Sequence, residues 1–188
     1  MQVSDVDREY TDRELVELAQ RSPQAFKLLV DRYWRRLYAF VKRLYFMEHE
    51  EIEDVIQEAF LKIYRNLQAF DDAFSFSTWA YQITRNCAID SLRKKRVRPQ
   101  TIALTEEEWE QLRVIATEEQ EQPFDLALIK KVIQELPLLY REPFTLFYLE
   151  QKTYEEMVDI LKKPKGTIAS LVSRAKVLVR ERANQFSL

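Results

Sequence analysis

The chain has 188 residues, which is enough for one large domain or two small ones. Hydrophobic residues make up 46% and charged residues 32%, so a core can form, yet the chain contains one glycine. Sheets and tight hairpins usually need glycine turns, so this composition predicts an all-α protein. No apolar run approaches the roughly 20 residues of a membrane span, and the acidic start, MQVSDVDREY, is unlike a secretory signal. We therefore expect a cytoplasmic protein with no membrane insertion.

Residues for common catalytic and metal sites are scarce. Cys87 is the only cysteine, which excludes an intramolecular disulfide and a cysteine-based zinc site. His49 is the only histidine and lies among acids, where a solvated residue near a helix start is a simpler interpretation than a metal ligand. The sequence has no nucleophile–base pair, glycine-rich phosphate loop or Walker motif. We expect a protein that is not an enzyme and needs no metal or cofactor.

The net charge of −2 is distributed very unevenly along the chain. Taken block by block, it is −3 for residues 1–23, +4 for 24–98, −7 for 99–125 and +4 for 126–188. Two basic blocks separated by an acidic one are typical of two modules that face nucleic acid. We predict an N-terminal domain at 1–98, an acidic linker at 99–124 and a C-terminal domain at 125–188.

The first basic block opens with amphipathic helices. A Thr-x-x-Glu capping box predicts a short helix at 11–21, and apolar residues spaced at three and four predict a long one at 24–47. A third helix is expected from about 52 to 67, with its core face formed by Val55, Ala59, Phe60, Ile63 and Leu67. Away from the centre of that face lie Asp54, Gln57, Glu58 and Leu61. Such a cluster is either solvated surface or a docking site.

Four aromatic rings flank two aspartates in the next segment, 66–79. The rings are Phe70, Phe74, Phe76 and Trp79. A loop of this kind can close a core or stack unpaired bases, and core closure is the simpler interpretation for most of the rings. Ser75 and Ser77 are candidate helix caps.

The stretch from Trp79 to Arg98 predicts a helix that is apolar on two sides. Trp79 and Ile83 are most simply core residues. Between the apolar sides runs a polar strip available for a specific contact, formed by Gln82, Asn86 and Arg93. The helix ends in a basic cluster: Arg93, Lys94, Lys95, Arg96 and Arg98. Such an end either complements the helix dipole in water or binds phosphates.

Residues 99–124 are acidic and weakly periodic, which indicates a linker with at most one unstable helix near 106–115. Beyond it, helices are predicted at 125–135, 139–150, 153–162 and from 167 onward. A capping box of Thr153 and Glu156 opens the third, and the turn KKPKG, which holds Gly166, separates it from the fourth. Helix, tight turn and helix predict a helix-turn-helix whose second helix can enter a major groove. An αα-hairpin that binds no DNA is the alternative.

The last helix has two distinct faces. Its buried face is expected to carry Ile168, Leu171, Val172, Ala175, Leu178 and Val179. Its outward face is expected to carry Ala169, Ser170, Ser173, Lys176 and Arg180, with Arg174 at the edge.

With these elements in order, the chain resembles the extracytoplasmic-function sigma factors, the smallest class of bacterial RNA polymerase sigma subunit. The resemblance covers about 25–182. The family's promoter-melting domain is similar to AFKLLVDRYWRRLYAFVKRL, EDVIQEAFLKIYRNL and FSTWAYQITRNCAIDSLRKKR. Its C-terminal helix-turn-helix domain is similar to LPLLYREPFTLFYLEQKTYEEMVDIL, PKGTI and SRAK. Several motifs at the right spacing in one chain are more specific than any single one.

The resemblance implies site residues. Asp54, Gln57 and Glu58, with Leu61 beside them, match a motif that docks on the clamp helices of the polymerase β′ subunit. Loop 70–77 matches the loop that holds a base flipped from the −10 element. The implied −10 contacts are Phe74, Ser75, Phe76, Trp79, Gln82, Arg85, Asn86, Asp90, Arg93, Lys94, Lys95 and Arg96. The implied −35 contacts are Lys165, Thr167, Ala169, Ser170, Ser173, Arg174, Lys176 and Arg180.

The implied function is an alternative sigma factor that binds core RNA polymerase, reads −10 and −35 promoter elements and melts the −10 region. The linker matches a segment that threads through polymerase, and the C-terminal domain would also contact the β flap. A cognate anti-sigma factor is expected as a further partner. Two alternatives stay open: a helix-turn-helix regulator that binds duplex DNA without polymerase, and a helical adaptor that binds only protein.

The sequence departs from the family pattern in the last two helices. Ala169 and Leu171 stand where family members commonly carry basic residues, which should weaken phosphate anchoring near the −35 element. Met157 and Val158 replace the usual Ile-Ala pair, which is a change in packing only.

Overall fold

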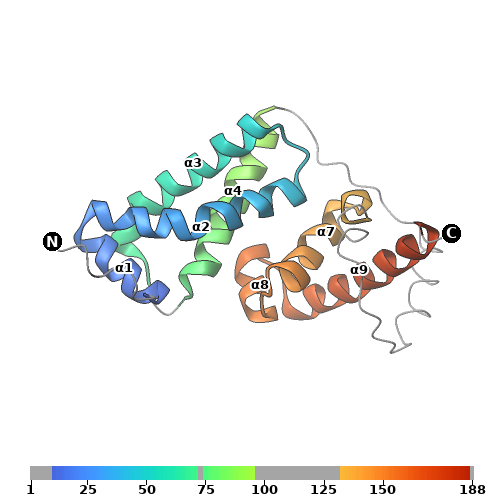
Figure 1. Cartoon of the computed structure of the whole chain (residues 1–188). Helices are drawn as coiled ribbons and strands as arrows, with labels where there is room; N and C mark the ends of the chain where they lie inside the picture. The colour runs from blue at the N-terminus through green and yellow to red at the C-terminus, as the bar shows by residue number, and fades with distance from the viewer. Residues whose placement is uncertain (1–9, 72–73, 96–131, 187–188) are drawn as a thin grey trace.

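The computed structural model describes residues 10–71, 74–95 and 132–186. The N-terminal half contains α1 (Asp12–Arg21), α2 (Pro23–Leu44), α3 (His49–Asn66), a 3-10 turn (Leu67–Ala69) and α4 (Phe76–Lys94). The C-terminal half contains α7 (Leu138–Phe144), a π-helical turn (Thr145–Leu149), α8 (Tyr154–Leu161) and α9 (Lys165–Phe186). Figure 1 shows the two groups side by side. The described residues include no strand, and the all-α prediction is confirmed.

Local capping sets the ends of the first helices. The predicted capping box opens α1: the Glu14 N–H donates to Thr11 Oγ1 at 3.3 Å, and the Thr11 N–H donates to Glu14 Oε2 at 2.8 Å. Pro23 lies in the first turn of α2, where its missing N–H costs nothing. Helix α3 begins at His49, earlier than predicted. Glu48 caps it there, because the Glu48 N–H donates to the Glu51 carboxylate at 3.2 Å.

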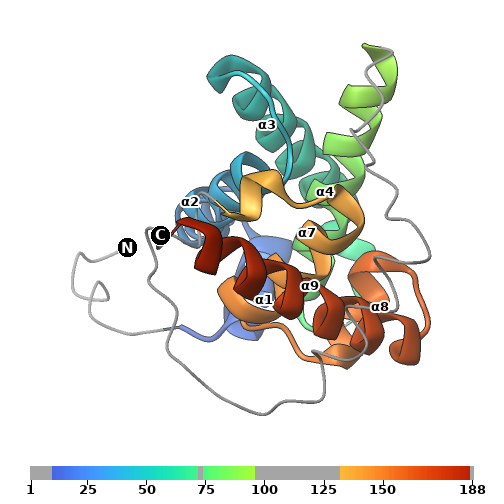
Figure 2. The same cartoon turned by 90° about the vertical axis from the view of Figure 1, so that its right-hand side faces the viewer.

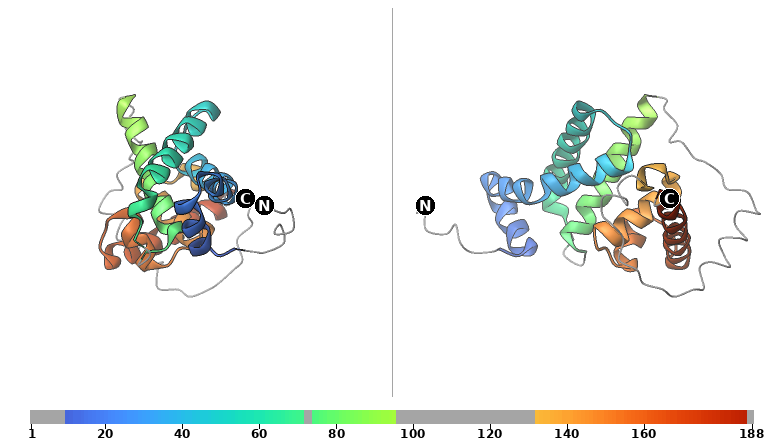
Figure 3. Two further views of the ribbon diagram at one scale, coloured as in Figure 1. Left: turned by 90° about the vertical axis from the view of Figure 1, so that its left-hand side faces the viewer. Right: turned by 45° about the vertical axis from the view of Figure 1, so that its right-hand side comes forward.

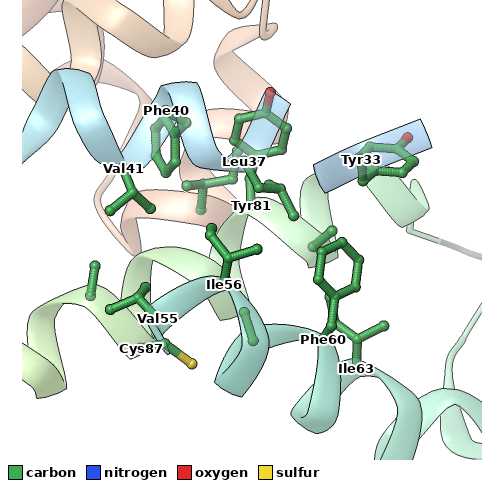
Figure 4. Close-up of a cluster of buried hydrophobic side chains, with 14 of the residues drawn as sticks. Tyr33, Leu37, Phe40, Val41, Val55, Ile56, Phe60, Ile63, Tyr81 and Cys87 are labelled. Atoms are coloured by element: carbon green, nitrogen blue, oxygen red, sulfur yellow. The ribbon is translucent and has the colours of Figure 1, made fainter. Parts of the chain in front are cut away.

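Helices α2, α3 and α4 enclose the main core. Figure 4 shows side chains from the three helices converging, among them Tyr33, Phe40, Ile56 and Tyr81. The predicted core face of α3 is buried throughout: Val55, Ala59, Phe60, Ile63 and Leu67. Burying each large apolar side chain contributes roughly 1.5–3 kcal/mol, so this core fixes α4 against the other two helices.

Helix α4 starts and ends earlier than its sequence indicates. Ser75 caps it by accepting the Thr78 N–H at 3.1 Å, as one of the two predicted caps, and the helix ends at Lys94. Trp79 and Ile83 were predicted in the core but are only partly buried against it. The interior positions of this helix are taken instead by Phe76, Ala80, Thr84 and Cys87. Arg96, Arg98 and the linker 99–124 lie outside the described residues.

The C-terminal half departs from the predicted pattern at α7. The single helix expected at 139–150 is split into α7 and the π-helical turn, with Pro143 inside α7, where it lacks a backbone donor. Of the helix predicted at 125–135, only residues 132–135 are described, and they are helical.

Helices α8 and α9 form the predicted helix-turn-helix. The capping box of α8 is confirmed, since the Thr153 N–H donates to Glu156 Oε2 at 2.9 Å and the Glu156 N–H donates to Thr153 Oγ1 at 3.2 Å. The predicted turn KKPKG is present at its first three residues, but Gly166 does not belong to it. Helix α9 already begins at Lys165, so Gly166 lies in its first turn, and the left-handed residue is Lys162, with a φ of 54°.

The two halves pack directly against each other. Figures 2 and 3 show α7 and α8 lying beside α4. One hydrophobic cluster joins the core of the N-terminal half to side chains of the C-terminal half: Leu146, Met157, Ile160, Leu161, Ile168 and Val172. A second cluster lies within the C-terminal half, around Tyr140, Phe144 and Leu171. In the described part of the chain, no helix is long and apolar enough to cross a membrane.

Candidate polymerase and nucleic-acid interfaces

One face of α3 presents the residues expected to bind polymerase. Asp54, Gln57 and Leu61 are exposed, Leu61 to 54%, and Glu58 is half-buried, so the spacing of three and four places all four along one α3 stripe. Glu58 Oε1 lies 3.0 Å from Lys62 Nζ, and this hydrogen bond holds the Glu58 pKa below its usual value. Asp54 and Gln57 have no side-chain partner among the described residues. An exposed leucine ringed by polar groups suits a protein partner.

The aromatic loop is partly a core element and partly surface. Phe76 is buried, with its ring 5.2 Å from that of Tyr33, so it anchors the loop and is not placed to touch DNA. Phe74 is 51% exposed, and Phe70 packs on Trp79 with ring centroids 4.9 Å apart. Beside them lies a cavity of about 280 Å³, whose lining includes Phe74, Trp79, Gln82 and, from α8, Asp159 and Lys162.

The far end of α4 carries polar and basic side chains. Asn86 is exposed and Gln82 and Asp90 are half-buried, while Arg93, Lys94 and Lys95 are exposed. Arg93 Nη1 lies 3.6 Å from Asp90 Oδ1, and Lys95 pairs with Glu51 of α3. The predicted polar strip of Gln82, Asn86 and Arg93 therefore reaches the surface.

Arg85 is not on that surface. Its guanidinium donates to both oxygens of Glu142, from Nε to Oε1 at 2.8 Å and from Nη2 to Oε2 at 3.0 Å. The Arg85 side chain is 15% exposed and that of Glu142 only 8%. Tyr45 also donates its hydroxyl to Glu142 Oε1 at 2.8 Å. Burial of the Arg85 guanidinium would lower its pKa, but the hydrogen bonds and the charge of the Glu142 carboxylate outweigh burial and raise the Arg85 pKa.

Two further carboxylates of the C-terminal half reach α4 and its neighbours. Glu150 accepts hydrogen bonds from Arg43 Nη1 and from the Tyr81 hydroxyl, both at 2.5 Å. Glu156 Oε1 accepts from Thr78 Oγ1 and from Lys152 Nζ, both at 2.9 Å.

Lys152 is itself buried at this boundary. Its ammonium donates to Ser77 Oγ at 2.7 Å and lies 5.1 Å from the centroid of the Tyr81 ring. It therefore ties the start of α8 to α4 with a hydrogen bond as well as a cation–π contact.

Helix α9 presents a mixed outward face. Lys165, Thr167, Ser170 and Ser173 are exposed, and Lys165 pairs with Glu155 of α8. The remaining predicted contacts are half-buried: Ala169, Arg174, Lys176 and Arg180. Leu171 is 7% exposed and belongs to the second hydrophobic cluster, which confirms its predicted place on the buried face of the helix. Of the two departures from the family pattern, Ala169 is therefore the one nearer the outward face.

His49 is the first residue of α3, and it is exposed as predicted. Its Nδ1 lies 2.6 Å from the Tyr38 hydroxyl. Among the described residues, no group of three or more side chains could hold a metal ion.

Comparison with known proteins identifies the family. The Sigma-70 region 2 model matches residues 29–98 and the Sigma-70, region 4 model matches residues 126–179. The chain is 34% identical over 180 residues to the ECF RNA polymerase sigma-E factor of Escherichia coli, covering 91% of this chain and 93% of that one. The chain belongs to the extracytoplasmic-function sigma factors. This sigma factor is also 32% identical over 181 residues to the sigma-E factor of Haemophilus influenzae, covering 92% and 95% of the two chains.

Two solved structures share the fold of this sigma factor. One is the sigma factor RpoE in complex with the anti-sigma factor NepR from Bartonella quintana, with a TM-score of 0.64, 24% identity, and 85% and 96% of the two chains covered. The other is CnrH in complex with the cytosolic domain of CnrY, with a TM-score of 0.64, 20% identity, and 90% and 95% covered.

Sequence reasoning missed Glu142, Glu150, Glu156 and Lys152 as contacts between the halves of the sigma factor. Their partners lie far away in the chain: the Arg85–Glu142 pair spans 57 positions and the Arg43–Glu150 pair 107. No local spacing encodes such pairs. The one signal for these contacts in the sequence was that Glu142, Glu150 and Glu156 are acidic residues within the basic block 126–188.

Proposed function

We propose that this sigma factor directs core RNA polymerase to promoters by reading −10 and −35 elements and capturing bases of the melted −10 strand. It catalyses no reaction itself and works in the cytoplasm, where polymerase and chromosome are. The observation that carries the proposal is that both sigma-70 regions match in order, on halves whose surfaces hold many of the expected contact side chains, although Phe76 is buried and Arg85 is paired with Glu142. We assign 1–98 to the −10 domain, 99–124 to the acidic linker and 125–188 to the −35 domain.

The α3 stripe is the proposed dock for the β′ clamp helices. Asp54 and Gln57 are exposed and unpartnered within the described residues, so they are available without first breaking an internal contact. Leu61 supplies the apolar surface that such a dock needs. We assign contact with the β flap to the C-terminal half.

The −10 interface consists of the exposed part of the aromatic loop and the polar strip of α4. Phe74 and Trp79 lie beside a cavity in which an unstacked base can be held. Asn86 is exposed and offers its amide to the edge of that base. Arg93, Lys94, Lys95 and Arg96 are assigned to backbone phosphates. Phe76 supports the loop from inside, and Arg85 becomes available only once Glu142 releases it.

The −35 interface is the outward face of α9, which a helix-turn-helix places in the major groove. Lys165, Thr167, Ser170 and Ser173 are the exposed members. A cognate anti-sigma factor is a further proposed partner. Of the two solved structures of the same fold, one is a sigma factor bound to an anti-sigma factor, and the other is CnrH bound to the cytosolic domain of CnrY.

The test is in vitro transcription with purified core polymerase over a library of promoter fragments, with and without this sigma factor. Promoter-specific transcripts are expected, and D54A/Q57A should abolish both the transcripts and co-purification with core polymerase. The control is Asn66→Ala, which is exposed on the last turn of α3 and about 120° around the helix from Asp54. Duplex binding without any stimulation of polymerase would contradict the proposal and favour a helix-turn-helix regulator.

A further inference from the structure

We propose that a basic cavity, formed by α2 together with the chain just before α8, binds a small anion that carries two or more phosphate groups. The cavity has a volume of about 470 Å³, which suits a ligand larger than a single ion. Its lining includes four cationic side chains, those of Arg35, Arg36, Arg43 and Lys152, and the carboxylate of Glu150. None of these four cations belongs to either proposed DNA interface, so this is a separate site.

Arg35 and Arg36 are the cations most available to a ligand. Both are exposed, and neither makes an ion pair or a hydrogen bond with another residue in the part of the chain that the structure describes. Arg32, one turn earlier on α2, is engaged, with its Nη1 2.8 Å from Asp12 Oδ1. A free guanidinium offers a fork of N–H donors that matches the oxygens of a phosphate. An exposed arginine alone is ordinary solvated surface, so the proposal depends on the other wall of the cavity.

That wall contributes a cation almost out of water. The Lys152 side chain is 8% exposed, and its ammonium donates to Ser77 Oγ at 2.7 Å and to Glu156 Oε1 at 2.9 Å. An ammonium has three donors, so one more is available to an anion in the cavity. Because a buried cation is costly unless anions compensate it, an anion beside Lys152 would stabilise this side chain further.

The residue before Lys152 has a strained backbone at the edge of the cavity. Gln151 has a φ of 51°, in the left-handed region that residues other than glycine rarely adopt. The turn is held on both sides, since the Glu150 N–H donates to the Thr145 carbonyl at 3.0 Å and the Lys152 N–H donates to the Leu146 carbonyl at 2.9 Å. Glycine would adopt this φ without strain, so a glutamine here favours a role for its side chain. Gln151 is exposed and lines the cavity, where its amide N–H groups can donate to a phosphate.

The spacing of the cations favours a ligand with several phosphate groups. Arg35 and Arg43 lie about two turns apart on α2, or about 12 Å along the helix axis, and Lys152 comes from the other half of the chain. One phosphate group cannot meet cations spread over such a span, whereas a diphosphate can meet two or more of them. A DNA strand is the alternative source of phosphates. It suits the site less well, because the cations come from two halves and line one cavity instead of following one surface.

The test is isothermal titration calorimetry of the full-length protein at physiological salt, with inorganic pyrophosphate, ADP and orthophosphate as titrants. Pyrophosphate is expected to bind at one site per chain. Orthophosphate should bind about tenfold more weakly, because it loses at least one charge-assisted contact. Orthophosphate binding as tight as that of pyrophosphate would contradict a site built for more than one phosphate group.

Two matched double variants locate the site on α2. R35Q/R36Q should weaken pyrophosphate binding about a hundredfold, since each guanidinium lost removes one charge-assisted contact. R21Q/R65Q removes the same charge from exposed arginines at the ends of α1 and α3, and should change the affinity by less than about twofold. Circular dichroism checks that each variant is folded.

A second pair of variants tests the wall from the C-terminal half. Q151E adds a carboxylate at the cavity and should weaken pyrophosphate binding about tenfold by repulsion. Q134E adds the same charge at another exposed glutamine of that half, one that does not line the cavity, and should leave the affinity unchanged.

Three results would overturn the proposal: no binding of pyrophosphate or ADP to the wild type, equal losses in R35Q/R36Q and R21Q/R65Q, or an unchanged affinity in Q151E. If neither diphosphate binds and R35Q/R36Q binds a fluorescent single-stranded oligonucleotide more weakly than R21Q/R65Q does, the two arginines belong to a DNA contact instead. Within the proposal, equal affinities for pyrophosphate and ADP would identify the diphosphate group alone as the ligand, and tighter binding of ADP would identify a nucleoside diphosphate.

Discussion

Arg141 donates from Nη1 to the backbone carbonyl of Leu44, 2.8 Å away in the other half of the molecule. The same guanidinium donates to the carbonyls of Leu136 and Gln134, at 2.6 and 2.9 Å, and lies 4.6 Å from the centroid of the Phe46 ring. Burial lowers the Arg141 pKa without any carboxylate to offset it. The Arg141 guanidinium thus satisfies backbone carbonyls at the end of the helical segment 132–135 and at the end of α2.

Arg141→Lys is therefore expected to destabilise the protein although it keeps the charge. The compact ammonium of lysine cannot reach all three carbonyls that the planar guanidinium binds, so at least one carbonyl stays without a hydrogen bond in the interior. We expect a loss of about 1–3 kcal/mol in the free energy of unfolding. Urea unfolding followed by circular dichroism measures it. Lys163→Arg is the matched control, and a loss as small as the control's would refute this account of Arg141.

Glu156 gives the stability a defined pH dependence. Burial alone would raise the Glu156 pKa, but hydrogen bonds from the Thr153 N–H, the Lys152 ammonium and the Thr78 hydroxyl together lower it from its usual value. A carboxyl whose pKa falls on folding stabilises the protein above its unfolded pKa, and that contribution disappears as pH falls through the folded value. The wild type should exceed Glu156→Gln by about 1 kcal/mol at pH 7, with the difference vanishing below the folded pKa. Urea unfolding at pH 7, 5 and 4 measures it, and a difference that grew on acidification would have the wrong sign.

Two substitutions on neighbouring positions of α9 should have opposite consequences. Ala169→Lys adds a cation on the outward face and should tighten −35 binding, steepening the salt dependence by about one phosphate contact. Leu171→Lys puts an ammonium into the second hydrophobic cluster and should cost several kcal/mol of stability. DNA binding at several salt concentrations, with thermal unfolding alongside, separates them. Stable folding of Leu171→Lys with tighter DNA binding would show that this side chain faces the groove.

Asn86→Ala tests the polar strip without removing any of the hydrogen bonds between the halves described above. The side chain is exposed, so unfolding should be unchanged. Loss of one hydrogen bond to an unpaired base corresponds to about 1 kcal/mol, or roughly fivefold in promoter opening. Permanganate reactivity of the −10 thymines in the polymerase complex measures opening. Ser91→Ala, further along the same helix, is the control.

The helices and their main contacts with the core could be predicted because both depend on local spacing. Val55 to Leu67 repeat at helical intervals, and the capping boxes at Thr11 and Thr153 involve residues three apart. The left-handed residue in the turn before α9 could not be predicted. Glycine is the usual residue in that conformation, but here Lys162 adopts it, at some cost in backbone strain.

The exposure of the candidate site could be predicted only in part. The polar strip of α4 and the α3 stripe follow from periodicity, and the structure leaves both on the surface. Arg85 lies on the same helix and was expected beside Asn86 at the DNA. Its burial depends on where a second half of the chain packs, and that information is spread over a hydrophobic cluster and three long-range pairs rather than any motif.

Glu156 uses its two oxygens for different purposes. Oε2 accepts the N–H that opens α8, and Oε1 accepts from Thr78 and Lys152 across the boundary between the halves. A residue that begins the helix-turn-helix therefore also ties that motif to the N-terminal half. An evolutionary change at this position would alter the start of α8 and the contact between the halves in the same step, so these two features cannot vary independently here.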